Sequence, residues 1–198
     1  MNIFKLGLFL LVGIFLFPMM LMAEPVKGKK SFNSFKDAKK ADSRLEFVIE
    51  STKVGIFSSD VDGYVKEFSY EADYDKKNGI IRNMKISFHA NKMDTDSEGR
   101  NEKLHKLCMS YDKFKIVTVQ VPGPVFVKSA RKAKMQGTVE IRGKKKKFTI
   151  ELSVTEKSGK LHVEGTSVWG FKAMEIPDPS IAVAKVSEAI KVHIQLKI

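Results

Sequence analysis

After residue 43, apolar and polar residues alternate along most of the chain, and this two-residue period predicts β-strands. Leu45, Phe47 and Ile49 alternate with polar neighbours, which predicts a strand with one apolar face. A short second strand is expected over residues 54–58. Similar patterns recur later in the chain over residues 68–74, 80–90, 114–121, 125–128, 135–142, 148–154, 161–165 and 186–198. Eight or so short strands at roughly regular spacing predict an all-β antiparallel barrel or sandwich.

Turn residues separate these segments, and one helix interrupts them. Asn78-Gly79 predicts a tight hairpin turn, because both residue types tolerate a positive φ. Ser158-Gly159 predicts another turn, and we also expect turns at residues 60–63 and at residues 143–147, where Gly143 precedes a basic run. Over residues 95–108, Leu104, Leu107 and Cys108 share a helical face, while Thr95 and Glu98 have the spacing of a capping box.

The first residues have the three parts of a secretory signal, since Lys5 is followed by the uncharged apolar run 6–23, which ends in Ala23. We expect cleavage after Ala23 and a periplasmic or secreted protein. An uncleaved membrane anchor is the alternative, because such a run can just span a bilayer. Residues 24–42, rich in Lys and Ser, predict a flexible basic leader. Residues 43–198 then form one domain.

The formal charge of +12, or +11 after loss of Lys5, indicates acidic partners. Export makes nucleic acid improbable and favours anionic lipid head groups or envelope polymers, although lysines also serve simply to solubilise a surface. Cys108 is the only cysteine, so no intramolecular disulfide can form. Its apolar neighbours favour a buried small side chain over a reactive thiol.

No pattern of catalytic residues is evident. The four histidines are scattered without metal-ligand spacing, and Cys108 has no adjacent base. Asp94 and Asp96 precede the predicted helix, where acidic residues are expected on capping and dipole grounds. We therefore expect no enzyme, no metal site and no cofactor apart from a bound lipid.

Three strings resemble motifs of the YceI-like family. Residues 93–104 (MDTDSEGRNEKL) resemble its S-I-D-T-G-N-E-x-R-D-x-H-L segment, residues 137–143 (GTVEIRG) its G-x-L-T-I-R-G strand and turn, and residues 176–181 (IPDPSI) the loop before its last strand. The resemblance extends from about residue 35 to residue 198. It implies a lipocalin-like eight-stranded antiparallel β-barrel, usually periplasmic, with a channel for a polyisoprenoid or another long-chain lipid and the helix at the barrel mouth.

The resemblance also assigns candidate ligand-binding residues. Arg100 occupies the family's Arg position, where a guanidinium can hold a phosphate or carboxylate head group, or instead fix the helix to the barrel. Leu104 lies on the same helix, and Tyr111 is a candidate for the polar end. The apolar stripes can line a channel or simply form core: Phe47, Ile49, Phe57, Phe88, Phe148, Ile150 and Trp169.

Two functions from different classes follow. The first is an exported protein that holds a polyisoprenoid or other long-chain lipid in the barrel interior. The second is a basic envelope-surface protein with a side-chain-filled barrel, attached to anionic lipids or polymers through residues 131–134 and 144–147. A long-chain lipid is the expected partner, and an anionic membrane surface and a second copy of the chain are left open.

Overall fold

The computed structural model describes residues 23–53, 57–127 and 132–198. Except for Ala23, the expected signal segment lies outside these residues. Within the part of the chain that is described, no helix is both long and apolar enough to cross a membrane.

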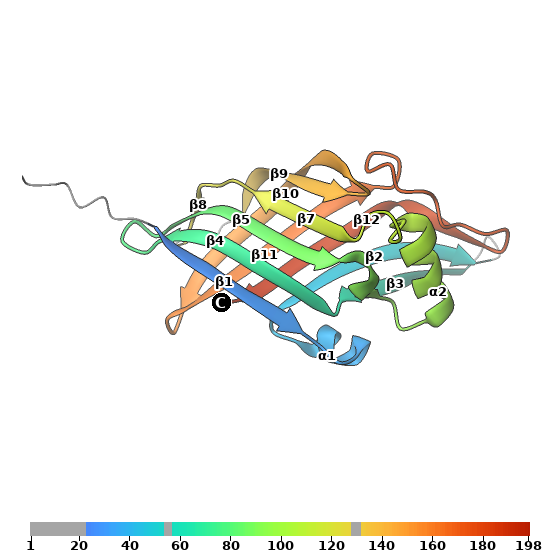
Figure 1. Ribbon diagram of the computed structural model, residues 1–198, viewed down its shortest axis with the longest axis horizontal. Coiled ribbons are helices and arrows are strands. Elements are labelled where there is room, and N and C mark those ends of the chain that lie inside the picture. The colour runs from blue at the N-terminus through green and yellow to red at the C-terminus, as the bar shows by residue number, and fades with distance from the viewer. Residues whose placement is uncertain (1–22, 54–56, 128–131) are drawn as a thin grey trace, which may run out of the picture.

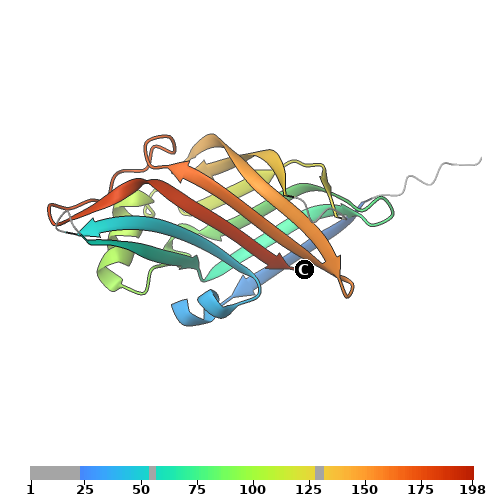
Figure 2. The ribbon, with the colours of Figure 1, turned by 180° about the vertical axis from the view of Figure 1, so that it is seen from behind.

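One curled antiparallel sheet dominates the described residues (Figures 1 and 2). Its strand order is β1-β4-β5-β7-β9-β10-β11-β12-β2-β3-β6, and β8 pairs with β5 outside this path. The strands are β1 (Glu24–Ser31), β2 (Arg44–Lys53), β3 (Phe57–Val65), β4 (Glu67–Asp75), β5 (Ile80–His89), β6 (Met93–Asp94), β7 (Ile116–Val121), β8 (Val125–Phe126), β9 (Ala133–Ile141), β10 (Lys144–Lys157), β11 (Lys160–Gly170) and β12 (Ala184–Lys197).

The helical segments are short. Helix α1 (Phe35–Lys40) follows β1, and Ser34 caps it by accepting a hydrogen bond from the Asp37 N–H at 3.2 Å. A 3-10 turn, η1 (Ala90–Lys92), follows β5. Helix α2 (Glu98–Lys103) continues into a π-helical turn, η2 (Leu104–Cys108). In Figure 1, α2 lies at one end of the curled sheet, beside β2 and β3.

The core lies on the concave face of the sheet, because alternate side chains of each strand point inward. Strand β10 shows this pattern most clearly: Phe148, Ile150, Leu152 and Val154 are buried, whereas Thr149 and Glu151 are exposed. The predicted barrel-like all-β antiparallel fold is therefore confirmed, with more strands than the eight expected.

The gap between the two ends of the sheet is spanned by short connections rather than by strand pairing. Lys66, between β3 and β4, accepts a backbone hydrogen bond from Phe32 and donates one to Lys92, both at 2.8 Å. Helix α1 packs on β2 and β3, and the rings of Phe35 and Tyr64 meet edge to face at 5.2 Å. The sheet is thus curled into a half-barrel.

Several local predictions were wrong. Residues 24–42 are not a loose leader, because β1 pairs with β4 from Glu24 to Ser31 and α1 follows it. Residues 60–63 lie within β3 and are not a turn. The turn expected at residues 143–147 is confined to Arg142 and Gly143, because β10 begins at Lys144. The Thr95–Glu98 capping box is absent, since the cap of α2 is Ser97.

Candidate ligand cavity beneath helix α2

A cavity of about 360 Å³ lies between α2 and the sheet. One row of its wall crosses three paired strands, since Ile49 of β2 faces Ile190 of β12, which faces Trp169 of β11. Exposed residues such as Gly99 and Ile181 also contribute to the lining, so the cavity reaches the surface near α2. Its walls are mostly apolar: Phe47, Ile49, Val61, Met93, Leu104, Cys108, Met109, Ile141, Trp169, Phe171, Ile176, Ile181, Val186, Ile190 and Val192.

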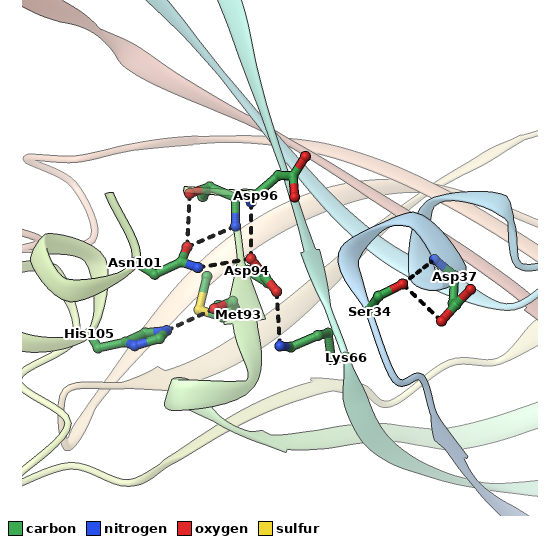
Figure 3. Close-up of polar contacts among 9 residues, drawn as sticks. Ser34, Asp37, Lys66, Met93, Asp94, Asp96, Asn101 and His105 are labelled. Carbon is green, nitrogen blue, oxygen red and sulfur yellow. Dashed lines mark hydrogen bonds and ion pairs between the residues drawn. The ribbon is translucent and has the colours of Figure 1, made fainter. Parts of the chain in front are cut away.

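The start of α2 is fixed by a polar cluster around Asp94 (Figure 3). One carboxylate oxygen of Asp94 accepts hydrogen bonds from Asn101 Nδ2 at 2.8 Å and from the Asp96 N–H at 2.9 Å. The other pairs with Lys66 Nζ at 2.9 Å. Burial raises the pKa of Asp94, but these three donors outweigh burial and hold its pKa below the ordinary 3.8. The ionised carboxylate therefore ties α2 to the connection between β3 and β4.

The end of the helical segment is held from the turn between β9 and β10. Arg142 Nη1 donates to the carbonyls of Leu107 at 3.0 Å and Cys108 at 2.8 Å, and to Ser110 Oγ at 2.8 Å. These carbonyls end a helix and have no partner within it, so a guanidinium satisfies them well. Halfway along, His105 Nε2 bonds to the Met93 carbonyl at 2.7 Å (Figure 3). Contacts at its start, middle and end thus hold the helical segment over the cavity.

Two cations of α2 line the cavity, Arg100 and Lys103. Arg100 donates to the Thr95 carbonyl at 2.6 Å and to Thr95 Oγ1 at 3.3 Å, and Lys103 donates to the Pro179 carbonyl at 3.1 Å. In the described part of the chain, neither cation forms an ion pair with a carboxylate. Each keeps its positive charge and spare N–H donors near the opening. Both contacts of Arg100 are local, because Thr95 lies between β6 and α2.

Two smaller apolar cavities continue from the first into the half-barrel. A middle cavity of about 70 Å³ shares Phe47, Met93, Trp169 and Val192 with the cavity beneath α2. An inner cavity of about 40 Å³ shares Ile86, Val119, Ile150 and Ile194 with the middle one. The three form a line through the interior, divided by side chains.

The structure gathers eight of the ten candidate ligand residues along this line. Phe47, Ile49, Arg100, Leu104 and Trp169 line the cavity beneath α2. The others line the middle cavity, and one of them also lines the inner cavity: Phe88, Phe148 and Ile150.

Two candidates lie elsewhere. Phe57 is 71% exposed, because it opens β3 opposite Lys53, beyond the end of the packed interior. Tyr111 packs partly buried against the core and lines none of the three cavities. Neither position is that of an interior ligand contact.

Several lining residues carry no distinct sequence signal. Met93 and Ile176 lie in a two-residue strand and in a loop, where no period distinguishes inward from outward positions. Lys103 could have been found, because it follows Arg100 by three residues on one helix and therefore shares its face.

Cys108 lines the cavity and is 2% exposed. Burial raises the pKa of its thiol to about 11, against the opposing influence of Arg142. The thiol is therefore neutral and unreactive at ordinary pH, as the sequence predicted. Within the described residues, no three His, Cys, Asp or Glu side chains gather closely enough to hold a metal ion.

The basic run 144–147 is partly neutralised. Lys144 and Lys146 both form ion pairs with Glu175, and these two lysines lower the pKa of Glu175 to about 2. The neighbouring run 131–134 begins at Arg131, which lies outside the described residues. The charge available to an anionic polymer at residues 144–147 is therefore smaller than the sequence suggests.

One protein family and several solved structures resemble this chain. A family model described as YceI-like domain matches residues 37–198. No curated protein matches the chain. Among solved structures, BcnA of Burkholderia cenocepacia aligns with a TM-score of 0.64 at 14% identity, covering 79% of this chain and 96% of BcnA.

Two further structures align similarly. A polyisoprenoid binding domain from Saccharophagus degradans, implicated in plant cell wall breakdown, has a TM-score of 0.61 at 15% identity, covering 78% of this chain and 92% of that domain. The YceI protein of Campylobacter jejuni has a TM-score of 0.57 at 19% identity, covering 71% and 85% respectively. At these identities the likeness establishes a shared fold.

Proposed function

Since this chain belongs to the YceI-like domain family, we propose that it is an exported, non-enzymatic binding protein that holds a long-chain apolar lipid, such as a polyisoprenoid, beneath α2. The observation that carries the proposal is the apolar cavity of about 360 Å³, whose lining includes two cations, Arg100 and Lys103. Cavities of roughly 300–1,000 Å³ are typical of small-molecule sites. The similar domain from Saccharophagus degradans is a polyisoprenoid binding domain, which supports the same class of ligand.

The walls supply affinity without a specific polar anchor. Each methylene moved from water to an apolar site contributes about 0.8 kcal/mol. Ten such groups contribute roughly 8 kcal/mol, from which the entropic cost of association is subtracted. The tail therefore contributes to affinity in proportion to the length that is buried, even where the site contacts no particular chemical group along it.

The helix supplies a preference for the head. Arg100 and Lys103 are three residues apart on one helix, and among the described residues both bond to neutral oxygens. A phosphate or carboxylate head placed between them gains charge-assisted hydrogen bonds that a neutral head cannot match. We therefore expect an anionic amphiphile whose tail enters the cavity.

Binding is tested with the protein purified from its own envelope, by native mass spectrometry and solvent extraction. We expect a co-purifying lipid of fixed mass. Because Trp169 is the only tryptophan and lines the cavity, its fluorescence should also change on titration with a long-chain probe. Recovery without lipid, combined with an unchanged emission spectrum, would refute the proposal.

The head preference is tested by replacing both cations, R100Q with K103Q. The double variant should lose at least about tenfold in affinity for a prenyl phosphate, while its affinity for the corresponding prenol stays within about twofold. K106Q is the matched control, because Lys106 lies in η2, is exposed and pairs with Glu102 at 2.8 Å. Equal losses for phosphate and prenol would show that the cations act only structurally.

Export is a separate part of the proposal. Amino-terminal sequencing of the protein recovered from the periplasm or medium should begin at Glu24, since the apolar run ends in Ala23. Recovery of the full-length chain in the membrane fraction would favour the anchor instead.

A further inference from the structure

The cavity beneath α2 has a floor. Phe47, Met93, Trp169 and Val192 line both this cavity and the middle one, so these four side chains divide the two. Above the floor the volume is about 360 Å³, and below it the cavities measure about 70 Å³ and 40 Å³. The interior is therefore one chamber followed by two small voids.

The two lower cavities, of about 70 Å³ and 40 Å³, are small beside the chamber of about 360 Å³ above the floor. Their linings are almost wholly apolar, and such voids offer a chain no free passage without movement of close-packed side chains. A tail that enters at α2 meets the floor before it reaches the far end of the half-barrel.

Trp169 is the largest side chain of the floor, and it is held by packing. Its ring lies 5.4 Å from that of Phe148, and its buried Nε1 has no hydrogen-bond partner among the described residues. A buried indole N–H usually finds a partner. Because the indole N–H has no partner among the described residues, replacing Trp169 by a smaller residue breaks no hydrogen bond of its side chain.

Phe47 completes the floor because Gly63 makes room for it. The two residues face each other across β2 and β3, and a Cβ on Gly63 would lie 2.0 Å from Phe47 Cζ. Any larger residue at position 63 therefore pushes the ring off the wall and into the interior. A smaller residue at position 169 should therefore lower the floor, and a larger residue at position 63 should raise it.

We infer that the floor of Phe47, Met93, Trp169 and Val192 sets the maximum tail length that the chamber accepts, with Trp169 as the specificity-determining residue. The inference rests on the proposed function and narrows it to amphiphiles whose tail ends within the chamber. Longer polyisoprenoids gain nothing from the units that cannot pass the floor.

The test measures affinity for geranyl, farnesyl, geranylgeranyl and octaprenyl monophosphates, by displacement of a fluorescent fatty-acid probe. In the unaltered protein, affinity should rise at least about tenfold per added isoprene unit and then level off, with octaprenyl no tighter than geranylgeranyl. W169A should move this limit to longer tails, and G63A should move it to shorter ones. V168A is the matched control, since Val168 adjoins Trp169 and is exposed.

The two variants act in opposite directions, so a general loss of stability cannot imitate the expected result. If W169A fails to fold, the shift in G63A and the opposite shift in M93A still decide the matter. Affinity that rises through octaprenyl in the unaltered protein, or an unchanged limit in the variants, would overturn the inference and leave the proposed function standing. Failure of every prenyl phosphate to bind the unaltered protein would instead refute the proposed function.

Discussion

Replacing Asp94 by Asn should detach the start of α2 from the sheet. The side chain of Asp94 is only 12% exposed, and its carboxylate accepts from Lys66, Asn101 and the Asp96 N–H. Asn keeps the shape but removes the charge, and it turns one of the two oxygens into an NH₂ group. At least one of the three donors then faces another donor.

The magnitude follows from these contacts. Charge-assisted hydrogen bonds are about twice as strong as neutral ones, and a hydrogen bond to a charged group contributes roughly 1.5–3 kcal/mol. Lys66 is 31% exposed and regains water when it loses its partner, which reduces the loss at that contact. We expect D94N to lower the free energy of unfolding by about 2–3 kcal/mol. For a domain of this size, Tm should fall by roughly 4–12 °C.

Calorimetry of D94N beside D96N provides the assay, because both variants remove one carboxylate and keep the side-chain shape. Asp96 is exposed and has φ of 58°, a conformation that Asn tolerates, so D96N should change stability by less than about 0.5 kcal/mol. Hydrogen exchange at residues 98–103 should accelerate in D94N alone. Equal melting temperatures in the two variants would show that the Asp94 cluster does not hold the helix.

Three shorter predictions follow from the same geometry. The pKa of the Asp94 carboxyl is held below 3.8 in the folded protein, so its contribution to stability is complete above pH 3.8 and is lost as the pH falls through the lower folded pKa. In that pH range, hydrogen exchange in α2 should accelerate before global unfolding, and D94N should show no such acceleration. Because the pKa of Cys108 is raised to about 11, iodoacetamide should modify it far more slowly at pH 8 than it modifies the urea-unfolded chain, and equal rates would contradict its burial. F47A should weaken lipid binding at least about tenfold, whereas F57A should leave binding within about twofold, since Phe57 is exposed; a comparable loss in both would place the ligand outside the cavity.

The alternation of side chains predicted most of the sheet and much of the site. Phe47 and Ile49 were recognised as inward residues of one strand, and both line the cavity. Phe57 shows where this reasoning stops. It has the same inward parity on β3 as Val61 and Val65, but it lies opposite Lys53, past the end of the interior. Alternation gives the face of a strand and not the height of a residue along the barrel.

The segment 24–31 shows a second limit. Its lysines, Pro25 and Gly28 give no apolar period, yet it forms a strand because β4 offers a free edge of backbone donors and acceptors. Backbone pairing at a sheet edge requires no apolar side chains. The helix was predicted, but the contacts that hold it in place were not. Lys66, which pairs with Asp94, and Arg142, which bonds to the Cys108 carbonyl, come from turns that are distant in the sequence.

Local sequence patterns predicted the all-β class, the helix near residues 95–108, the buried unreactive cysteine and the resemblance on which the family prediction rested, but not helix α1. These properties depend on local periods, on turn residues and on short strings whose meaning does not change with their surroundings. The division of the interior into a chamber, a floor and two small voids could be found only from the folded structure. The packing of Trp169, Phe47 and Gly63 from different strands sets these volumes, and no local pattern encodes how closely side chains from different strands approach.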